Sequence, residues 1–200
     1  MRTVTVNIYK IDELSRKAQR RAYEHWLEKA EYPWHDDNVK TLREFEKIFP
    51  IKIKGFEYSY EYGEGRNYIH FTFTEDENIE NLSGIRLLKY IYNNYFDYIS
   101  SKEIFYGKSK IRKSKIIYVP DYSLTGYCMD EAILGPIYKF FKKPEDISFY
   151  TLIKRCLNSW LDACRDDLEN YFSFTNFLDV ASVNKWEYLE NGDEANVAIL

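Results

Sequence analysis

Residues 148–172 constrain the fold of this 200-residue chain more than any other stretch, because they predict one long helix. Ser148 suits the N-cap position, where a hydroxyl can accept a bond from a free first-turn N–H. Apolar residues then recur in steps of three and four, which is typical of one buried helical face: Phe149, Ile153, Cys156, Leu157, Trp160, Cys164, Leu168 and Tyr171. Polar residues fall on the opposite side and should face water: Arg155, Asn158, Asp162, Asp166 and Glu169. We expect this helix to form the centre of the core.

The other stretches predict one α+β domain over residues 1–200, with five or six helices around a small, mostly antiparallel sheet. Further helices are predicted at residues 15–30, 39–49, 83–99, 129–141 and 173–183. Strands are predicted at residues 3–9, where Val4, Val6 and Ile8 form the buried side, and in hairpins at 51–62 with 67–74, at 102–119, and at 185–190 with 196–200. Asn191-Gly192 is a strong two-residue turn signal for the last hairpin.

Two of these helices carry an additional feature. Residues 83–99 place apolar side chains on two sides, so this helix is either sandwiched or presents an interface. Its main face is predicted to be Ile85, Leu88, Tyr92, Tyr95 and Ile99, with Leu87 and Tyr90 off that face. Residues 129–141 contain Gly135-Pro136, which predicts a kink or two short helices because proline removes a backbone hydrogen bond.

Charge and composition exclude some classes of function. Lys plus Arg number 28 and Asp plus Glu number 32, so the formal net charge is −4. A balance this mild argues against a chain that binds nucleic acid over its whole surface, and against a wholesale mimic of a phosphate backbone. Aromatic residues make up 18% of the chain, with 19 tyrosines and 13 phenylalanines. Tyrosine is enriched at protein interfaces, although an aromatic core also accounts for this content.

The sequence predicts a cytoplasmic protein without membrane contact, metal or cofactor. No stretch approaches the roughly 20 apolar residues of a membrane span, and the N-terminus has no signal-peptide run. Cys156 and Cys164 lie about 12 Å apart by helical rise, which is beyond the reach of a disulfide. No CxxC or Cys/His spacing typical of zinc sites occurs. His35 with Asp36 and Asp37 offers one nitrogen and two carboxylates, but helix capping is the simpler interpretation.

Catalytic candidates are few. His25 falls on the inner side of the first helix, which suits a histidine at the edge of the core. Cys128 precedes a predicted helix, where the free N–H groups and the helix dipole lower a thiol pKa. A cysteine nucleophile also needs a base, and no histidine is tied to Cys128 by local sequence. No phosphate loop, GxSxG, HExxH or paired-carboxylate motif appears, so we predict no catalytic residue and favour a protein that is not an enzyme.

Two charged surfaces are candidates for binding. A basic run at the tip of the second hairpin suits either a phosphate clamp or protection of an edge strand: Lys108, Lys110, Arg112, Lys113 and Lys115. Acidic and aromatic residues elsewhere could compete with nucleic acid for the basic groove of a partner protein: Glu57, Glu61, Glu64, Glu75, Asp76, Glu77, Tyr90 and Tyr98.

Several segments resemble a loose group of small proteins encoded by phages and prophages. The opening strand is followed by YKIDELSRKAQRRAYEHWLEKA, which has the Tyr-x-x-Asp/Glu-Leu-Ser turn and Ala-rich helix of that group. The likeness continues through TLREFEKIFPIKI, SGIRLLKYIYNNY, LTGYCMDEAILGPIYKF, CLNSWLDACRDDLENYFS and WEYLENGDE. Members are described as antitoxin-like or are uncharacterised, and their genetic setting is rich in inhibitors of host defence, including anti-CRISPR proteins. No motif of the group is catalytic, so the resemblance assigns no catalytic residue.

The sequence leaves three functions open. The first is a non-enzymatic phage protein that inhibits a nucleic-acid-targeting defence system of the host by stoichiometric protein binding. The second is the antitoxin of a toxin–antitoxin pair, which would also bind one protein tightly. The third is a cysteine-dependent enzyme that uses Cys128.

Overall fold

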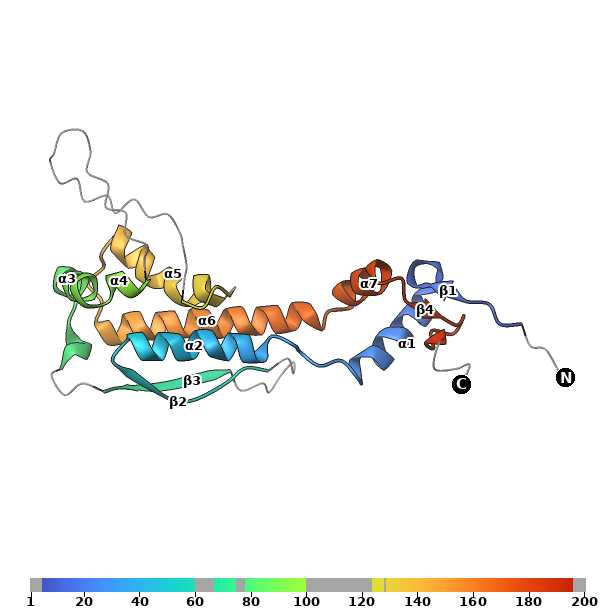
Figure 1. Cartoon of the computed structure of the whole chain (residues 1–200), viewed down its shortest axis with the longest axis horizontal. Helices are drawn as coiled ribbons and strands as arrows, with labels where there is room; N and C mark the ends of the chain where they lie inside the picture. The colour runs from blue at the N-terminus through green and yellow to red at the C-terminus, as the bar shows by residue number, and fades with distance from the viewer. Residues whose placement is uncertain (1–4, 60–66, 75–77, 100–123, 128, 196–200) are drawn as a thin grey trace, which may run out of the picture. The chain divides into compact units, whose positions relative to one another are not determined.

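The computed structural model describes residues 5–59, 67–74, 78–99, 124–127 and 129–195 (Figure 1). In these ranges it contains seven α-helices and two antiparallel two-stranded sheets, so the predicted α+β class is confirmed. The helices exceed the predicted five or six because residues 83–99 divide into α3 (Gly84–Asn94) and the short α4 (Phe96–Ile99). No helix in the described ranges is long and apolar enough to cross a membrane.

The chain divides into two compact units, which we describe separately. The core unit comprises residues 34–166, and the terminal unit comprises residues 1–33 together with residues 167–200. A single domain over residues 1–200 stays a prediction.

α6 (Phe149–Tyr171) confirms the long helix predicted from the sequence. The core unit is built on its residues 149–166, and residues 167–171 belong to the terminal unit. The helix begins as expected, because the Ser148 hydroxyl accepts a bond from the N–H of Thr151 at 3.1 Å. Every residue of the predicted apolar face is buried except Tyr171, which is half-buried. Trp160 is fully buried, and its indole N–H donates to the Asn38 carbonyl at 3.1 Å.

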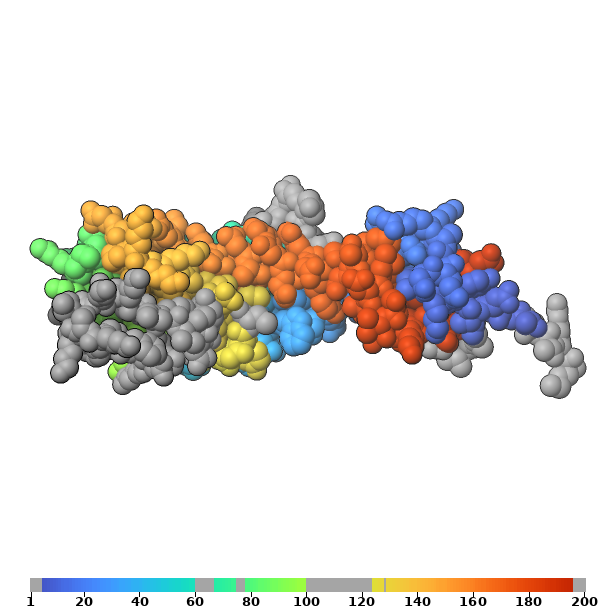
Figure 2. All heavy atoms as spheres, turned by 90° about the horizontal axis from the view of Figure 1, so that it is seen from above, coloured from blue at the N-terminus to red at the C-terminus, as the bar shows by residue number. Residues whose placement is uncertain are grey.

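The remaining elements of the core unit cover α6 and its neighbour α2 (His35–Ile48). The hairpin of β2 (Ile51–Glu57) and β3 (Tyr68–Phe73) lies on one side of this helix pair (Figure 1). On the other side lie α3, α4 and α5 (Met129–Lys142), and the space-filling view also places α5 against α6 (Figure 2). The first predicted hairpin is therefore confirmed in its two strands.

Two sequence-based predictions for the core unit are wrong in detail, and a third is wrong in one of its alternatives. α2 begins at His35 rather than residue 39, which places Asp36 and Asp37 in its first turn, where the helix dipole favours carboxylates. Of the two alternatives for residues 129–141, two short helices do not form, because α5 is one helix through Pro136, and the kink stays a prediction. The buried face of α3 is centred on Leu87 and Ile91, whereas the predicted face residue Ile85 is 58% exposed. A helix with apolar side chains on two sides gives no periodic signal that selects between them.

The terminal unit packs α1 (Arg16–Leu27) against α7 (Phe174–Val183). Between them lies a small core of buried side chains: Ile11, Leu14, Ala18, Ala22, Tyr23, Phe177, Ala181 and Tyr188. Both helices have the predicted N-cap, since Ser15 accepts from the N–H of Ala18 and Ser173 from that of Asn176.

The first predicted strand is wrong in extent. In the described residues it is reduced to β1 (Tyr9–Lys10), which pairs with β4 (Glu187–Tyr188). Val6 and Ile8 are each 47% exposed instead of buried. The partner strand offers only two residues for pairing, so the alternating residues before Tyr9 have no ladder to join. Residues 102–119 and 196–200, for which the sequence predicts further strands, lie outside the described residues.

A turn forms at Asn191-Gly192, but its loop spans residues 190–192 instead of the predicted two residues. The N–H of Gly192 donates to the Leu189 carbonyl at 2.9 Å, and the N–H of Leu189 donates to the Asp193 carbonyl at 2.8 Å. Gly192 has a φ of +93°, which an L-residue rarely adopts, and it lies directly against α1. A Cβ at this position would lie 2.2 Å from the Ala18 carbonyl oxygen.

Replacing Gly192 by alanine should therefore lower the free energy of unfolding by about 2 kcal/mol, from backbone strain and overpacking together. Gly126 is a matched control, because its φ is +84° but a Cβ added there would meet no atom of the described residues within 4 Å, apart from its chain neighbours. Gly126→Ala should lower the free energy of unfolding by the backbone strain alone, about 1 kcal/mol. Urea denaturation of both variants measures the difference; equal losses would contradict the close approach of this turn to α1.

Candidate partner-binding surfaces

The cysteines that the structure describes are not poised for nucleophilic chemistry. Cys156 and Cys164 are fully buried in α6. Burial raises the pKa of the Cys156 thiol, which keeps it protonated. Cys128 lies outside the described residues.

The two histidines with catalytic or metal-binding interpretations have structural partners. His35 Nδ1 lies 2.9 Å from the Tyr58 hydroxyl. His25 Nδ1 lies 3.5 Å from Asp193 Oδ1, and Arg21 contacts the same oxygen at 3.1 Å. Within the ranges that the structure describes, no group of three metal-ligating side chains comes together. The His25 cluster thus links α1 to the C-terminal turn.

Only part of the predicted binding surface falls on described residues. Tyr98 is 66% exposed, as a contact residue requires, and Glu57 is exposed at the end of β2. Tyr90 is half-buried, with its ring edge-on to Phe149 and its hydroxyl 3.2 Å from that of Tyr95. The other predicted contacts lie outside the described residues: Glu61, Glu64, Glu75, Asp76, Glu77, Lys108, Lys110, Arg112, Lys113 and Lys115.

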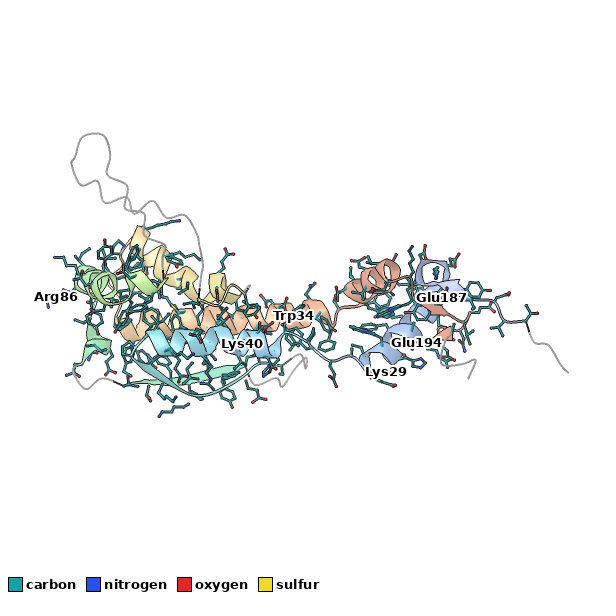
Figure 3. All side chains as sticks on the ribbon, in the orientation of Figure 1. Lys29, Trp34, Lys40, Arg86, Glu187 and Glu194 are labelled. Atoms are coloured by element: carbon teal, nitrogen blue, oxygen red, sulfur yellow. The ribbon has the colours of Figure 1, made fainter. Side chains whose placement is uncertain are left out.

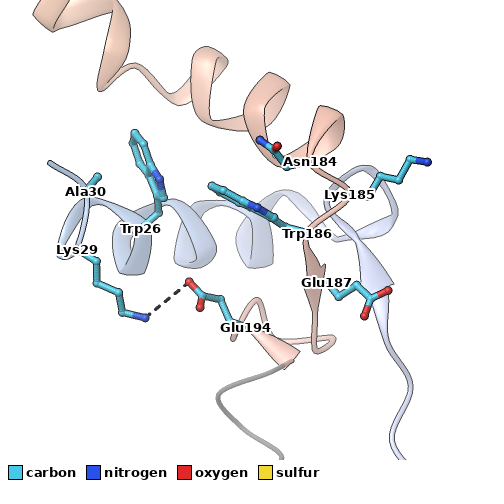
Figure 4. A pocket seen from close by; sticks show the side chains of 8 residues that line it. All are labelled: Trp26, Lys29, Ala30, Asn184, Lys185, Trp186, Glu187 and Glu194. Atoms are coloured by element: carbon cyan, nitrogen blue, oxygen red, sulfur yellow. Dashed lines mark ion pairs between the residues drawn. The ribbon is translucent and has the colours of Figure 1, made fainter. Parts of the chain in front are cut away.

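A hollow of about 520 Å³ opens in the terminal unit between α1 and the segment that joins α7 to β4 (Figure 4). Two indole rings dominate it, and Trp186 points along α1 toward Trp26. The lining consists of these two residues with one apolar and five polar side chains: Trp26, Lys29, Ala30, Asn184, Lys185, Trp186, Glu187 and Glu194. We call this hollow the tryptophan pocket.

The aromatic core of the terminal unit fixes both indoles. The Trp26 ring lies 5.5 Å from Phe177 and 5.9 Å from Tyr171, measured between ring centroids. The Trp186 ring lies 6.4 Å from the same Phe177. The N–H of Trp186 also donates to the Ala181 carbonyl at 3.0 Å, which ties its backbone to the end of α7. The walls of the pocket are therefore preorganised.

The rim of the pocket carries charges of both signs. Lys29 Nζ lies 3.7 Å from Glu194, and Lys10 Nζ lies 2.8 Å from Glu187. Lys185 makes no ion pair within the described part of the chain. Neither indole N–H has an acceptor among the described residues, so each remains available to a bound molecule. The pocket can thus take an apolar group and donate hydrogen bonds to oxygen atoms beside it.

A second exposed surface is the outer face of the β2–β3 hairpin. The strand register places Lys52 opposite Thr72 and Gly55 opposite His70. The rings of Tyr68 and His70 lie 5.1 Å apart along this face. An open strand face offers a partner less enclosed contact area than the tryptophan pocket does.

Comparisons with protein-family models, with curated proteins and with solved structures found no match for this chain.

Proposed function

We propose that this chain is a non-enzymatic interaction protein that acts by stoichiometric binding to one partner protein. In the setting implied by the resemblance to phage proteins, the partner is a nucleic-acid-targeting defence effector in the host cytoplasm, and binding inhibits it. The observation that supports binding is the tryptophan pocket, with its two fixed indoles and their unused N–H donors.

The pocket has the properties of an interface hot spot. Tryptophan is among the residues that contribute most to protein–protein affinity, especially in preorganised pockets surrounded by polar residues. Because Phe177 supports both rings, little side-chain entropy is lost when a partner docks. We propose that the occupant is a segment of the partner that inserts one apolar side chain and accepts hydrogen bonds from the indoles through its backbone carbonyls.

The test is capture of the partner by variants of the tagged full-length chain. Trp186→Ala should weaken binding at least about 30-fold, the effect of losing a tryptophan hot spot. Trp34→Ala is the matched control, because Trp34 is 53% exposed at the start of α2 in the core unit (Figure 3). It should leave affinity unchanged.

Thermal melts establish that both variants are folded before affinity is compared. Equal affinity of Trp186→Ala and the parent for the same partner would contradict the proposed site. If the captured partner is a toxin rather than a nucleic-acid-targeting effector, the function of this chain is that of an antitoxin and not defence inhibition. Stoichiometric binding would still hold.

A further inference from the structure

We propose a second site in the terminal unit: a phosphate-binding site for single-stranded nucleic acid, formed by Arg16, Lys17 and Arg20 of α1 beside Phe174 of α7. It goes beyond the proposed function and does not depend on it, because it lies on other residues than the tryptophan pocket.

The two guanidinium groups are held in place by one aromatic ring. The guanidinium carbons of Arg16 and Arg20 lie 4.9 Å and 4.2 Å from the centroid of the Phe174 ring. That ring is itself fixed, since it lies edge-on to Tyr23 at 5.3 Å and stacks on Phe177 at 6.4 Å. A planar guanidinium that is already positioned loses less entropy when it binds an anion than a free side chain does.

No carboxylate of the described residues neutralises these cations. Arg16, Lys17 and Arg20 are exposed and make no ion pair within the residues that the structure describes. The acidic residues just before α1, Asp12 and Glu13, form no ion pair with these cations, and Glu13 instead accepts a bond from the N–H of Lys10 at 2.7 Å. Four other described arginines are paired with carboxylates, whereas Arg86 of α3 is not: Arg21, Arg43, Arg155 and Arg165.

The position of the three cations is unfavourable for the helix itself. They fall in the first five residues of α1, whose first turn contains no acidic residue. Cations near a helix N-terminus oppose the helix dipole, and like charges four residues apart repel each other. The cation–π contacts with Phe174 offset part of this cost, but no carboxylate of the described residues pairs with the three cations. Departures from local stability rules of this kind are typical of functional sites. A bound polyanion would supply the missing negative charge.

A nucleic-acid strand fits this arrangement better than a single phosphate group does. Three cations along one helix face can contact successive phosphates, whereas one phosphate needs a single bidentate arginine. The guanidinium group of each arginine lies over Phe174, and both side chains are exposed to solvent, so each can also contact a bound base. Unpaired bases stack on guanidinium planes, which favours a single strand over a duplex.

The experiment measures fluorescence anisotropy of a labelled uridine RNA of about 15 nucleotides with the full chain, between about 50 and 200 mM salt. For single strands the slope of log K against log salt changes by about 0.7 per phosphate contact. Arg16→Gln/Arg20→Gln should therefore make the slope shallower by about 1.4 and lower affinity at least about tenfold at the lowest salt. Residues 108–115 are the same in the parent and the variant, so any phosphate contacts they make contribute equally to both salt slopes. Their contribution therefore cancels when the two slopes are subtracted.

The matched control is Arg43→Gln/Arg155→Gln, which removes the same charge from arginines that are ion-paired at 2.8 Å in the core unit. It should leave slope and affinity unchanged. Lys17→Gln leaves both arginines on Phe174 and should by itself reduce the slope by about 0.7, which keeps the test valid if the double arginine variant fails to fold. Absence of binding by the parent at about 50 mM salt, equal loss in the control, or equally tight binding of a duplex would overturn the proposal.

Discussion

Replacing Trp160 by alanine is expected to lower the free energy of unfolding by about 3–5 kcal/mol, the largest effect of any substitution considered for this chain. The indole is fully buried at the centre of α6. Phe56 and Tyr58 lie edge-on to it, at ring-centroid distances of 5.3 and 5.8 Å. Its loss would leave a cavity and also remove the bond to the Asn38 carbonyl, which joins α6 to the first turn of α2.

Urea denaturation of purified Trp160→Ala measures this loss. Asp162→Ala is the control on the opposite side of the same helix, where the side chain is 62% exposed, and it should stay within about 0.5 kcal/mol of the parent. A loss below about 1 kcal/mol for Trp160→Ala would show that α6 is not the centre of the core.

The second large effect is expected at Asp130, a carboxylate that is 1% exposed at the start of α5. Its Oδ2 accepts the N–H groups of Leu124, Thr125 and Gly126 at 2.8–2.9 Å. Its Oδ1 accepts the hydroxyls of Thr125 at 2.8 Å and Thr41 at 3.2 Å. Asp130→Ala leaves these donors without an acceptor, so it should lower the free energy of unfolding by about 3–4 kcal/mol.

Asp130→Asn separates the negative charge of this side chain from its hydrogen bonding, because the two side chains have nearly the same shape. Its amide oxygen can still accept the three N–H groups, and its NH₂ group can donate to the threonine hydroxyls. We therefore expect it to lose about half as much stability as Asp130→Ala in the same urea experiment. Equal losses would mean that the negative charge, rather than the number of acceptors, holds residues 124–126 against α5.

The helices that the sequence predicts well have one continuous apolar face. In α6, periodicity identifies the buried side because every third or fourth residue is large and apolar. In α3, the same reasoning selects the wrong side, because Leu87 and Ile91 compete with Ile85 and Leu88 for the core. At residues 3–9 the alternation is a genuine pattern, but strand length depends on a partner that local sequence does not describe.

The candidate sites depend on contacts between distant parts of the chain. Periodicity places Trp26 on the inner side of the first helix and Trp186 in a predicted strand, and no spacing rule joins them into a pocket. Arg16 and Arg20 fall in the helix predicted at residues 15–30, but their support by Phe174 depends on the packing of α7. For Asp130 the useful signal is its place in the first turn of a helix, after a Thr-Gly loop that can supply N–H groups.

Titration of the captured partner shows whether this chain acts by stoichiometric binding. The partner's nucleic-acid-directed activity is measured against increasing amounts of the parent chain and of Cys128→Ser. Binding predicts a linear loss of activity that ends near a one-to-one ratio, with the same end point for both proteins. Inhibition far below that ratio, or its loss in a folded Cys128→Ser variant, would contradict the account and favour a thiol enzyme, since a serine hydroxyl lacks thiolate nucleophilicity.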